Sequence, residues 1–480
     1  MRCVRAGPDF IDEPERYGNC GAQIVELPLE RFPGVNPGKL RLLADRAGLR
    51  TLATTAPAGG RGLPLLERAV LARLDYVELP LETDVETRGR FLAKSRKSAV
   101  KVVLSQRSDQ PPRSAETVLR TFQKCARAGG DLALVSCDVS RADDVRALRE
   151  ASAAARRQGI PHGLRGSGGL SALAPLLGAD LVFGDIDGRD EGLDIGLLSR
   201  ISPATRLCAV IGEPAHPEAA PGALNEFFRR GGLDHACIGL RPGPDGPGAL
   251  ARLLAEMGFL GILVGRPFRT AMASGAPAPA GGAPSVSVVR SRAGGLAGFD
   301  TDGPVLLRAL DDSGIRVHRR RALVLGTGGA ARSAARALRS RGAHVAVAGR
   351  DLRKALEAAG GAGARAARLA SVPKILARST LLVNAIPSAP SGLVPEECLR
   401  PGLVVVDLDC SPGASDLLDR AAGRGAHVVG GRAVLAKNLA EALRLFTGAR
   451  PSRRLVGDIL DEALRRAARS KKNLAPDQNY

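Results

Sequence analysis

Residues 322–337 of the chain read Ala-Leu-Val-Leu-Gly-Thr-Gly-Gly-Ala-Ala-Arg-Ser-Ala-Ala-Arg-Ala. The apolar run predicts a β-strand, the glycines a loop, and the Ala/Arg-rich stretch a helix. In this context the spacing G-x-G-x-x-A is typical of a dinucleotide-binding loop: Gly326 permits the tight turn, Gly328 lets the backbone approach a pyrophosphate, and Ala331 allows close packing of helix on strand. A glycine-rich turn with a purely structural role is the alternative.

The first turn of this helix supplies groups that face phosphates. Backbone N–H groups at a helix N-terminus, here those of Gly329 and Ala330, attract anions. The next strand ends at Gly349-Arg350-Asp351. A basic residue there suits the 2′-phosphate of NADP, and an acidic one the ribose hydroxyl of NAD. Arg350 therefore favours NADP, whereas the neighbouring Asp351 weakens this preference over NAD. The alternative is that Arg350 is a solvated arginine that binds no ligand.

Working outward from the loop, we expect a parallel sheet, because each further strand is followed by a helical or loop return. These strands are expected at 344–349, 380–386, 402–408 and 427–431. Helices at 434–446 and 453–467 close the fold, and residues 471–480 are expected to form a disordered tail.

The middle of the chain predicts a smaller α/β domain. Its strands are expected at 207–212, 234–240 and 261–265, with helical stretches between them. A Pro/Gly-rich segment at 274–284 then precedes a hairpin-like stretch at 285–298.

The first 200 residues alternate β-prone runs with helical stretches. The eight runs are 2–4, 23–27, 52–55, 76–79, 101–105, 132–136, 160–164 and 181–183. Eight parallel βα units close a barrel. The predicted architecture is therefore α/β throughout: a (β/α)8 barrel at 1–203, a small α/β substrate domain at 204–318, a Rossmann-type NADP-binding domain with closing helices at 319–470, and the tail at 471–480.

Composition fits globular domains, since 480 residues are 44% hydrophobic, 25% charged and 3% aromatic. The eight cysteines form no C-x-x-C pair, so we expect neither a metal site nor a disulfide framework. We find no apolar leader and no stretch near the roughly 18–20 apolar residues of a membrane helix. We therefore expect a cytoplasmic protein with no membrane partner.

The charge balance invites a nucleic-acid interpretation, because 69 basic against 49 acidic residues give a net charge of +20. However, the arginines are spread along the chain, and only 3 Tyr, 11 Phe and no Trp could stack on bases. We expect no nucleic-acid partner, and relate the positive field to a small anionic substrate. For the oligomeric state, the sequence is compatible with a homodimer.

The order of these parts resembles known families. The second half is similar to shikimate dehydrogenase: 261–269 fits its G-x-N-V-T-x-P-x-K loop and 298–303 fits G-x-N-T-D-G. The barrel resembles type I 3-dehydroquinate dehydratase, so the whole chain resembles the bifunctional dehydratase–dehydrogenase of the shikimate pathway. This resemblance implies an NADP-dependent oxidoreductase of aromatic amino acid biosynthesis, with a shikimate-like hydroxy acid as substrate.

The resemblance also implies roles for residues. Arg269 and Asp302 stand at the family's catalytic lysine and aspartate, Asp300 and Asn438 at substrate-binding positions, and Asn384 at the cofactor. A guanidinium has a pKa above ~12, so Arg269 can stabilise an oxyanion but is a poor general base. A salt bridge between Arg269 and Asp302 that closes the interdomain cleft is the alternative to catalysis.

Several positions depart from the family pattern. Glu218 and Ala220 replace two serines that bind the substrate carboxylate, and Leu263 and Gly265 replace an asparagine and a threonine. In the barrel, Leu134 stands where the family has its Schiff-base lysine.

Arg107 likewise replaces the catalytic histidine of the barrel family. Without an amine at Leu134 no imine can form, so we predict that the barrel has no dehydratase activity. Two hypotheses remain for the whole chain. It is an NADP-dependent oxidoreductase, which the intact glycine-rich loop favours, or a catalytically degenerate dinucleotide-binding scaffold or regulator, which the substitutions favour.

Overall fold

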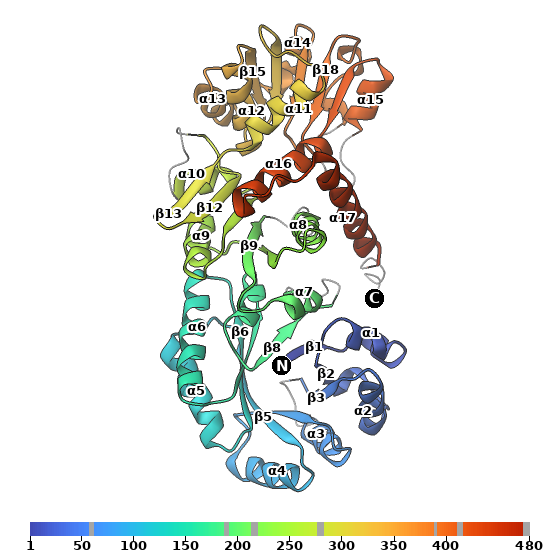
Figure 1. Ribbon diagram of the computed structural model, residues 1–480, viewed down its shortest axis with the longest axis vertical. Coiled ribbons are helices and arrows are strands. Elements are labelled where there is room, and N and C mark those ends of the chain that lie inside the picture. Colours follow the sequence, from blue (N-terminus) through green and yellow to red (C-terminus); the bar gives the residue numbers. More distant parts are fainter. Residues whose placement is uncertain are drawn as a thin grey trace. The chain divides into compact units, whose positions relative to one another are not determined.

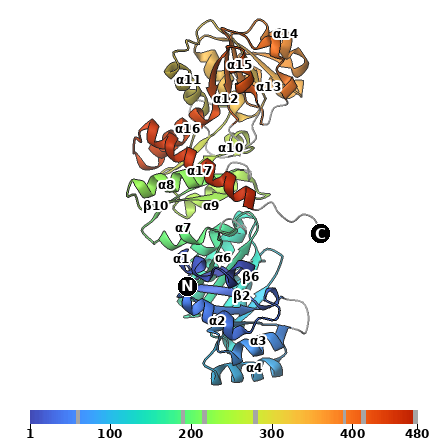
Figure 2. The same ribbon diagram turned by 90° about the vertical axis from the view of Figure 1, so that its right-hand side faces the viewer.

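The computed structural model describes residues 1–56, 62–186, 192–212, 219–275, 283–387, 391–409 and 416–473. The chain divides into two compact units. Met1–Ala204 with Pro242–Asp245 form the first, and Thr205–Arg241 with Gly246–Tyr480 form the second. Figure 1 labels their helices and strands, and Figure 2 shows them after a quarter turn.

Eight parallel strands of the first unit close into a barrel in the order β1 to β8, with β8 paired to β1. They are β1 Arg2–Arg5, β2 Ile24–Pro28, β3 Arg50–Thr54, β4 Tyr76–Pro80, β5 Lys101–Arg107, β6 Leu132–Asp138, β7 His162–Ser167 and β8 Leu181–Gly184. Each strand overlaps a predicted β-prone run, so the barrel is confirmed. Leu52, Val103 and Leu134 are buried together in its interior, which is therefore a packed core.

Helices return the chain between most barrel strands: α1 Pro14–Asn19, α2 Pro37–Arg46, α3 Gly62–Leu71, α4 Val85–Lys97, α5 Ala115–Arg127, α6 Ala142–Arg157, and after β8 α7 Ile195–Arg200. Side-chain caps begin four of them, since Asn36, Asp84, Ser114 and Asp194 each accept a backbone N–H of the following turn. The connection from β7 to β8 is a 3₁₀ helix, Ser171–Leu176, instead of an α-helix. Pro175 within it lacks the N–H that an α-helix would use.

The second unit contains two sheets. The smaller has the order β10-β9-β11-β12-β13, with β9 Arg206–Ile211, β10 His235–Leu240, β11 Gly261–Val264, β12 Val288–Arg292 and β13 Gly295–Phe299. β9, β10 and β11 are parallel, and β12 and β13 form the predicted antiparallel hairpin. Its helices are α8 Ala219–Arg230, α9 Gly246–Glu256 and α10 Arg269–Gly275.

The larger sheet has six parallel strands in the order β16-β15-β14-β17-β18-β19. They are β14 Arg321–Leu325, β15 His344–Gly349, β16 Arg365–Arg368, β17 Leu381–Asn384, β18 Val404–Asp407 and β19 His427–Gly430. β16 was not predicted, because this edge strand reads Arg-Ala-Ala-Arg and has no β-prone apolar run. The strand order reverses beside β14, and this is where open α/β sheets bind ligands.

Helices flank this sheet and lead back to the smaller one: α11 Asp302–Asp312, α12 Gly329–Ser340, α13 Leu352–Gly360, α14 Val372–Leu376, α15 Leu417–Gly423, α16 Gly431–Thr447 and α17 Arg453–Asn473. α17 is longer than predicted, so residues 471–473 of the expected disordered tail are helical; the rest of that tail lies outside the described residues. No helix in the described parts of the chain is long and apolar enough to span a membrane.

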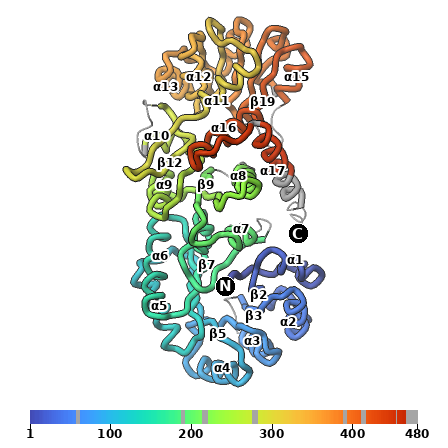
Figure 3. The backbone as a smooth tube through the Cα atoms, in the orientation of Figure 1, coloured from blue at the N-terminus to red at the C-terminus, as the bar shows by residue number. Residues whose placement is uncertain are grey.

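The closing helices α16 and α17 pack on α8 of the smaller domain, as the tube in Figure 3 also shows. Leu443 and Phe446 of α16 share one buried cluster with Ile459 of α17 and with Phe227 and Phe228 of α8. The end of the chain therefore completes the core of a domain that begins some 200 residues earlier, at β9.

Candidate active site

The glycine-rich loop joins β14 to α12 at the carboxyl edge of the larger sheet. Gly326 has a φ of +110°, which favours glycine, and a Cβ there would lie 3.2 Å from the carbonyl oxygen of Ala385. Gly328 precedes α12 in extended conformation, and a Cβ on it would meet no described atom within 4 Å. The loop is therefore open beside Gly328, directly before the first turn of α12.

The next residues of the loop have different surroundings. A Cβ on Gly329 would lie 2.7 Å from Cβ of Arg269 and 3.2 Å from Cβ of Ser285, both in the smaller domain. Ala331 is buried in the core under α12, and Ala330 is half-buried. Gly329 is thus required for the close approach of Arg269 to the loop.

The end of β15 lies against the same loop, since a Cβ on Gly349 would be 2.5 Å from Cγ2 of Thr327. Arg350 follows and is exposed. The carboxylate of Asp351 instead caps α13 by accepting the N–H groups of Arg353 at 2.8 Å and Lys354 at 3.3 Å. The Asp351 carboxylate therefore serves as the N-terminal cap of α13.

Asn384 ends β17 and is fully buried. Its Nδ2 donates to Oδ1 of Asp407 at 2.9 Å and to the Ile386 carbonyl at 3.2 Å, and its Oδ1 accepts the N–H of Ile386 at 3.1 Å. These bonds favour an indirect role, in which Asn384 shapes the loop after β17 beside Gly326.

Arg269, Asp302 and Asn438 meet from three helices, α10, α11 and α16. Nη1 of Arg269 forms an ion pair with Oδ2 of Asp302, and its Nε donates to the Val264 carbonyl at 2.9 Å. Nδ2 of Asn438 donates to Oδ1 of Asp302 at 3.1 Å. Both carboxylate oxygens of Asp302 are therefore partnered, and its side chain is only 6% exposed.

A chain of hydroxyl groups supports this cluster, and sequence reasoning missed it. Oγ1 of Thr301 donates to Oδ1 of Asn438 at 2.9 Å. Oγ of Ser287, on the segment that leads into β12, lies 2.8 Å from Oγ1 of Thr301 and accepts its backbone N–H at 2.8 Å. Thr301 stands within the quoted G-x-N-T-D-G segment and could have been noticed, whereas no pattern marks Ser287.

Asp300 lies beside the pair at the end of the β12–β13 hairpin. Its Oδ1 accepts a hydrogen bond of 2.6 Å from Oγ of Ser333 on α12, which itself accepts the N–H of Gly303 at 2.7 Å. Burial, and then repulsion by the Asp302 carboxylate, raise the pKa of Asp300 to about 6, against the opposing effects of Ser333 and Arg269. Asp300 therefore holds a proton more strongly than an exposed aspartate does.

The substituted positions of the opening segment are placed only in part. Glu218 lies outside the described residues. Ala220 is buried in α8 in the cluster that holds the closing helices. Leu263 is buried in the same cluster, and Gly265 follows β11, where a Cβ would be 2.9 Å from the Ile211 carbonyl oxygen.

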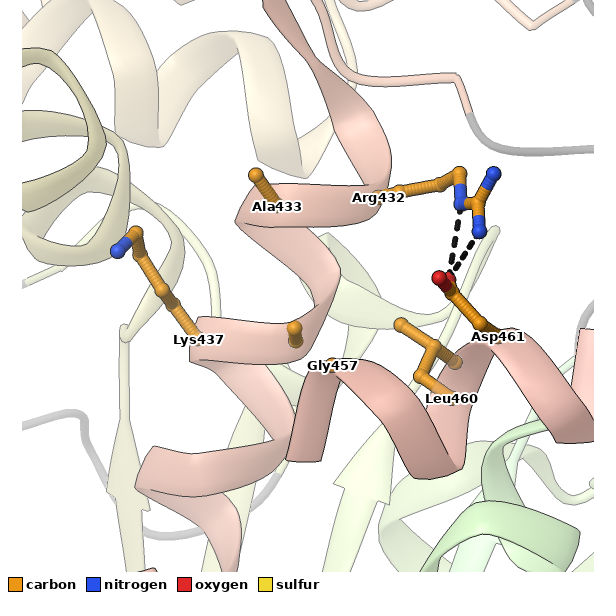
Figure 4. Close-up of a pocket in the computed structure, with 7 residues that line it drawn as sticks. Arg432, Ala433, Lys437, Gly457, Leu460 and Asp461 are labelled. Carbon is orange, nitrogen blue, oxygen red and sulfur yellow. Dashed lines mark hydrogen bonds and ion pairs between the residues drawn. The ribbon is translucent and has the colours of Figure 1, made fainter. Parts of the chain in front are cut away.

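A hollow of about 310 Å³ lies between α16 and α17 (Figure 4). Its lining includes Arg432, whose Nε donates to Oδ1 of Asp461 at 3.1 Å, and Lys437, which pairs with Asp312. At about 100° per residue, Ala433 and Ala436, which also line the hollow, lie on the side of α16 away from Asn438. The hollow is therefore separate from the Arg269–Asp302 cluster, and its two cations already have partners.

Side chains of the barrel strands also form ion pairs. Glu26 is buried and contacts Arg165 at 2.8 Å and Arg5 at 3.4 Å. Burial alone would raise the pKa of Glu26, but these arginines lower it. Arg107 pairs with buried Glu78 at 2.6 Å.

Leu134 belongs to the apolar core of the barrel and is fully buried. No amine is therefore available at this position, where the resemblance places the Schiff-base lysine.

The second unit has the fold of a pyridine-nucleotide-dependent dehydrogenase, in which a Rossmann-type sheet with its glycine-rich loop adjoins a smaller α/β domain. Over 245 residues it is 31% identical to "Shikimate dehydrogenase (NADP(+))" of Halobacterium salinarum, a match that covers 50% of this chain and 92% of the relative. The enzyme of the same name from Gluconobacter oxydans is 34% identical over 274 residues, covering 54% and 97%. The chain belongs to the shikimate dehydrogenase family.

A solved structure shares the fold of the second unit, and a family model matches part of the first unit. A crystal structure of shikimate dehydrogenase from Aquifex aeolicus superposes with a TM-score of 0.50 at 23% identity, covering 55% of this chain and 99% of that one, which shows the shared fold. In the first unit, the model of the type I 3-dehydroquinase family matches residues 54–198. Both predicted resemblances are thereby confirmed.

Proposed function

We propose that the second unit binds NADP and oxidises a shikimate-like hydroxy acid, as a step of the shikimate pathway. Support comes from the alignment, which spans nearly the full length of relatives named for NADP-dependent shikimate oxidation. The observation that carries the proposal is the meeting of Arg269, Asp302 and Asn438 beside Gly329 of the glycine-rich loop. A substrate held there would lie next to a dinucleotide on that loop.

The residues around the loop fit NADP. The open space beside Gly328 suits the pyrophosphate, with Gly326 in the turn and Gly329, Ala330 and Ala331 in the first turn of α12. Arg350 would pair with the 2′-phosphate, since Asp351 is committed to its helix cap. When bound, NADP⁺ supplies the acceptor for the hydride of the substrate alcohol.

The cluster supplies binding and charge for the substrate. Asn438 and Asp300 would hold substrate hydroxyl groups, and Arg269 would stabilise negative charge on the reacting oxygen. Asp302 fixes the guanidinium in this position through their ion pair. The small anionic hydroxy acid expected from the positive field of the chain fits a site built around an arginine.

A second candidate function is a degenerate scaffold that binds the dinucleotide without turnover. It is favoured by the ion pair itself, because Arg269 and Asp302 satisfy each other and Arg269 cannot act as a base. For the first unit we propose the absence of dehydratase activity, on the grounds that Leu134 is an apolar core residue.

One experiment separates the two functions of the second unit. Purified full-length protein is mixed with NADP⁺ and with shikimate, quinate or related hydroxy acids, and the absorbance of reduced nicotinamide is followed. Turnover with a hydroxy acid supports the oxidoreductase. Saturable NADP binding in a thermal-shift titration without turnover on any substrate supports the scaffold.

A further inference from the structure

Proton transfer in the Arg269–Asp302 cluster needs a group that ionises near neutral pH. Arg269 stays protonated, and two of its nitrogens are committed to Asp302 and to the Val264 carbonyl. Both carboxylate oxygens of Asp302 are engaged, Oδ2 by Arg269 and Oδ1 by the amide of Asn438. Neither residue is therefore suited to accept a proton from a substrate alcohol.

Asp300 has the opposite environment. It is half-buried two residues before Asp302, and its charge is repelled by the Asp302 carboxylate and attracted more weakly by Arg269. Burial and this repulsion favour the protonated form of Asp300. Its Oδ1 is fixed by Ser333 of α12, the helix that begins at the glycine-rich loop.

The other elements packed around Asp300 add few competing charges. On α11 the facing charge is Asp302, and on α10 it is Arg269. On α12 the neighbouring Arg332 is turned away to the Thr327 carbonyl at 3.0 Å and to Glu357 at 3.4 Å. On α16 the neutral amide of Asn438 donates to Asp302.

We propose that Asp300 is the general base of this site and accepts the hydroxyl proton of the substrate, in the role that Arg269 cannot fill. The step rests on the proposed function. The substrate O–H bond breaks and a new O–H bond forms on the Asp300 carboxylate, while the alcohol carbon is oxidised to a carbonyl and NADP⁺ takes its hydride. Arg269 stabilises the oxygen as the proton leaves.

The test is the pH dependence of kcat/KM for NADP⁺-dependent oxidation, compared among the native protein, Asp300→Asn and Asp300→Glu. The native profile should rise through an inflection near pH 6, in line with the raised pKa of Asp300. Asp300→Asn should lower kcat by about 10²–10⁴-fold and remove the inflection, and Asp300→Glu should restore part of both. A Ser333→Ala variant, which removes the hydrogen bond to Oδ1 of Asp300 and also the one from the N–H of Gly303, should shift the inflection and keep most of kcat.

Two outcomes overturn the proposal, and they are distinguishable. Turnover in Asp300→Asn with an unchanged inflection refutes the role of Asp300 and leaves the proposed oxidoreductase in place. Absence of turnover in the native protein at every pH, with NADP bound in a thermal-shift titration, refutes the proposed function and the base together. Circular dichroism and NADP affinity of Asp300→Asn show whether a loss of rate reflects unfolding.

Discussion

Gly329→Ala should distort the site from the cofactor side. The new methyl carbon would lie 2.7 Å from Cβ of Arg269, which is a backbone-proximal atom that cannot swing aside, and 3.2 Å from Cβ of Ser285. Overpacking of this kind lowers the free energy of unfolding by about 1–3 kcal/mol. Replacing a helical glycine by alanine raises it by about 0.5–1 kcal/mol. The net loss is then about 1 kcal/mol, or a Tm lowered by roughly 2–4 °C for a unit of this size.

Gly328→Ala is the matched control, because its φ is −76° and its Cβ would meet no described atom within 4 Å. It should leave the Tm of the cofactor-free protein unchanged or slightly raised, since alanine restricts the unfolded chain. The assay is differential scanning calorimetry of both variants without NADP, followed over the transition of the second unit. If Gly328→Ala loses as much Tm as Gly329→Ala, the close approach of Arg269 to the loop is wrong.

Three further outcomes are expected. NADP should raise the Tm more than NAD does, and Arg350→Ala should remove the difference while the equally exposed Arg378→Ala keeps it; equal shifts in the native protein would contradict the assignment. Borohydride with 3-dehydroquinate should leave the protein mass unchanged, since Leu134 has no amine, and an adduct would show that another lysine serves. Burial, and then Arg206, lower the pKa of His235, so the unfolded chain binds the extra proton and stability should fall as pH decreases below the ordinary value of 6.5. Thermal melts from pH 7.5 to 5.5 check this, and His235→Phe should flatten the slope.

Much of the fold could be predicted from the sequence, because its elements have strong local patterns. All eight barrel strands and the glycine-rich loop coincide with apolar runs and turn residues that define them without tertiary context. The strand β16 was not predicted from the sequence. Arg365–Arg368 form a strand because they pair with the end of β15, and their own composition does not favour one. Edge strands of this kind are specified by their neighbours.

The residues of the candidate site were proposed from the sequence, but most of the contacts between them were not. The pairing of Arg269 with Asp302 was foreseen as one alternative, and the structure contains that ion pair. The bond from Asn438 to Asp302 and the raised pKa of Asp300 could not be foreseen, because they depend on which side chains α11 and α16 bring together over 136 residues of sequence. Local patterns carry no information about such distant contacts.

The packing of α16 and α17 on α8 has a consequence for how the protein is made. A ribosome releases β9 and α8 long before Leu443, Phe446 and Ile459 exist, so the smaller domain emerges with part of its apolar core uncovered. It can close only after nearly the whole chain has been synthesised. Nascent chains that end before α16 should therefore be protease-sensitive in 205–300, whereas the barrel, whose strands are all synthesised by Gly184, can fold on the ribosome as an early unit.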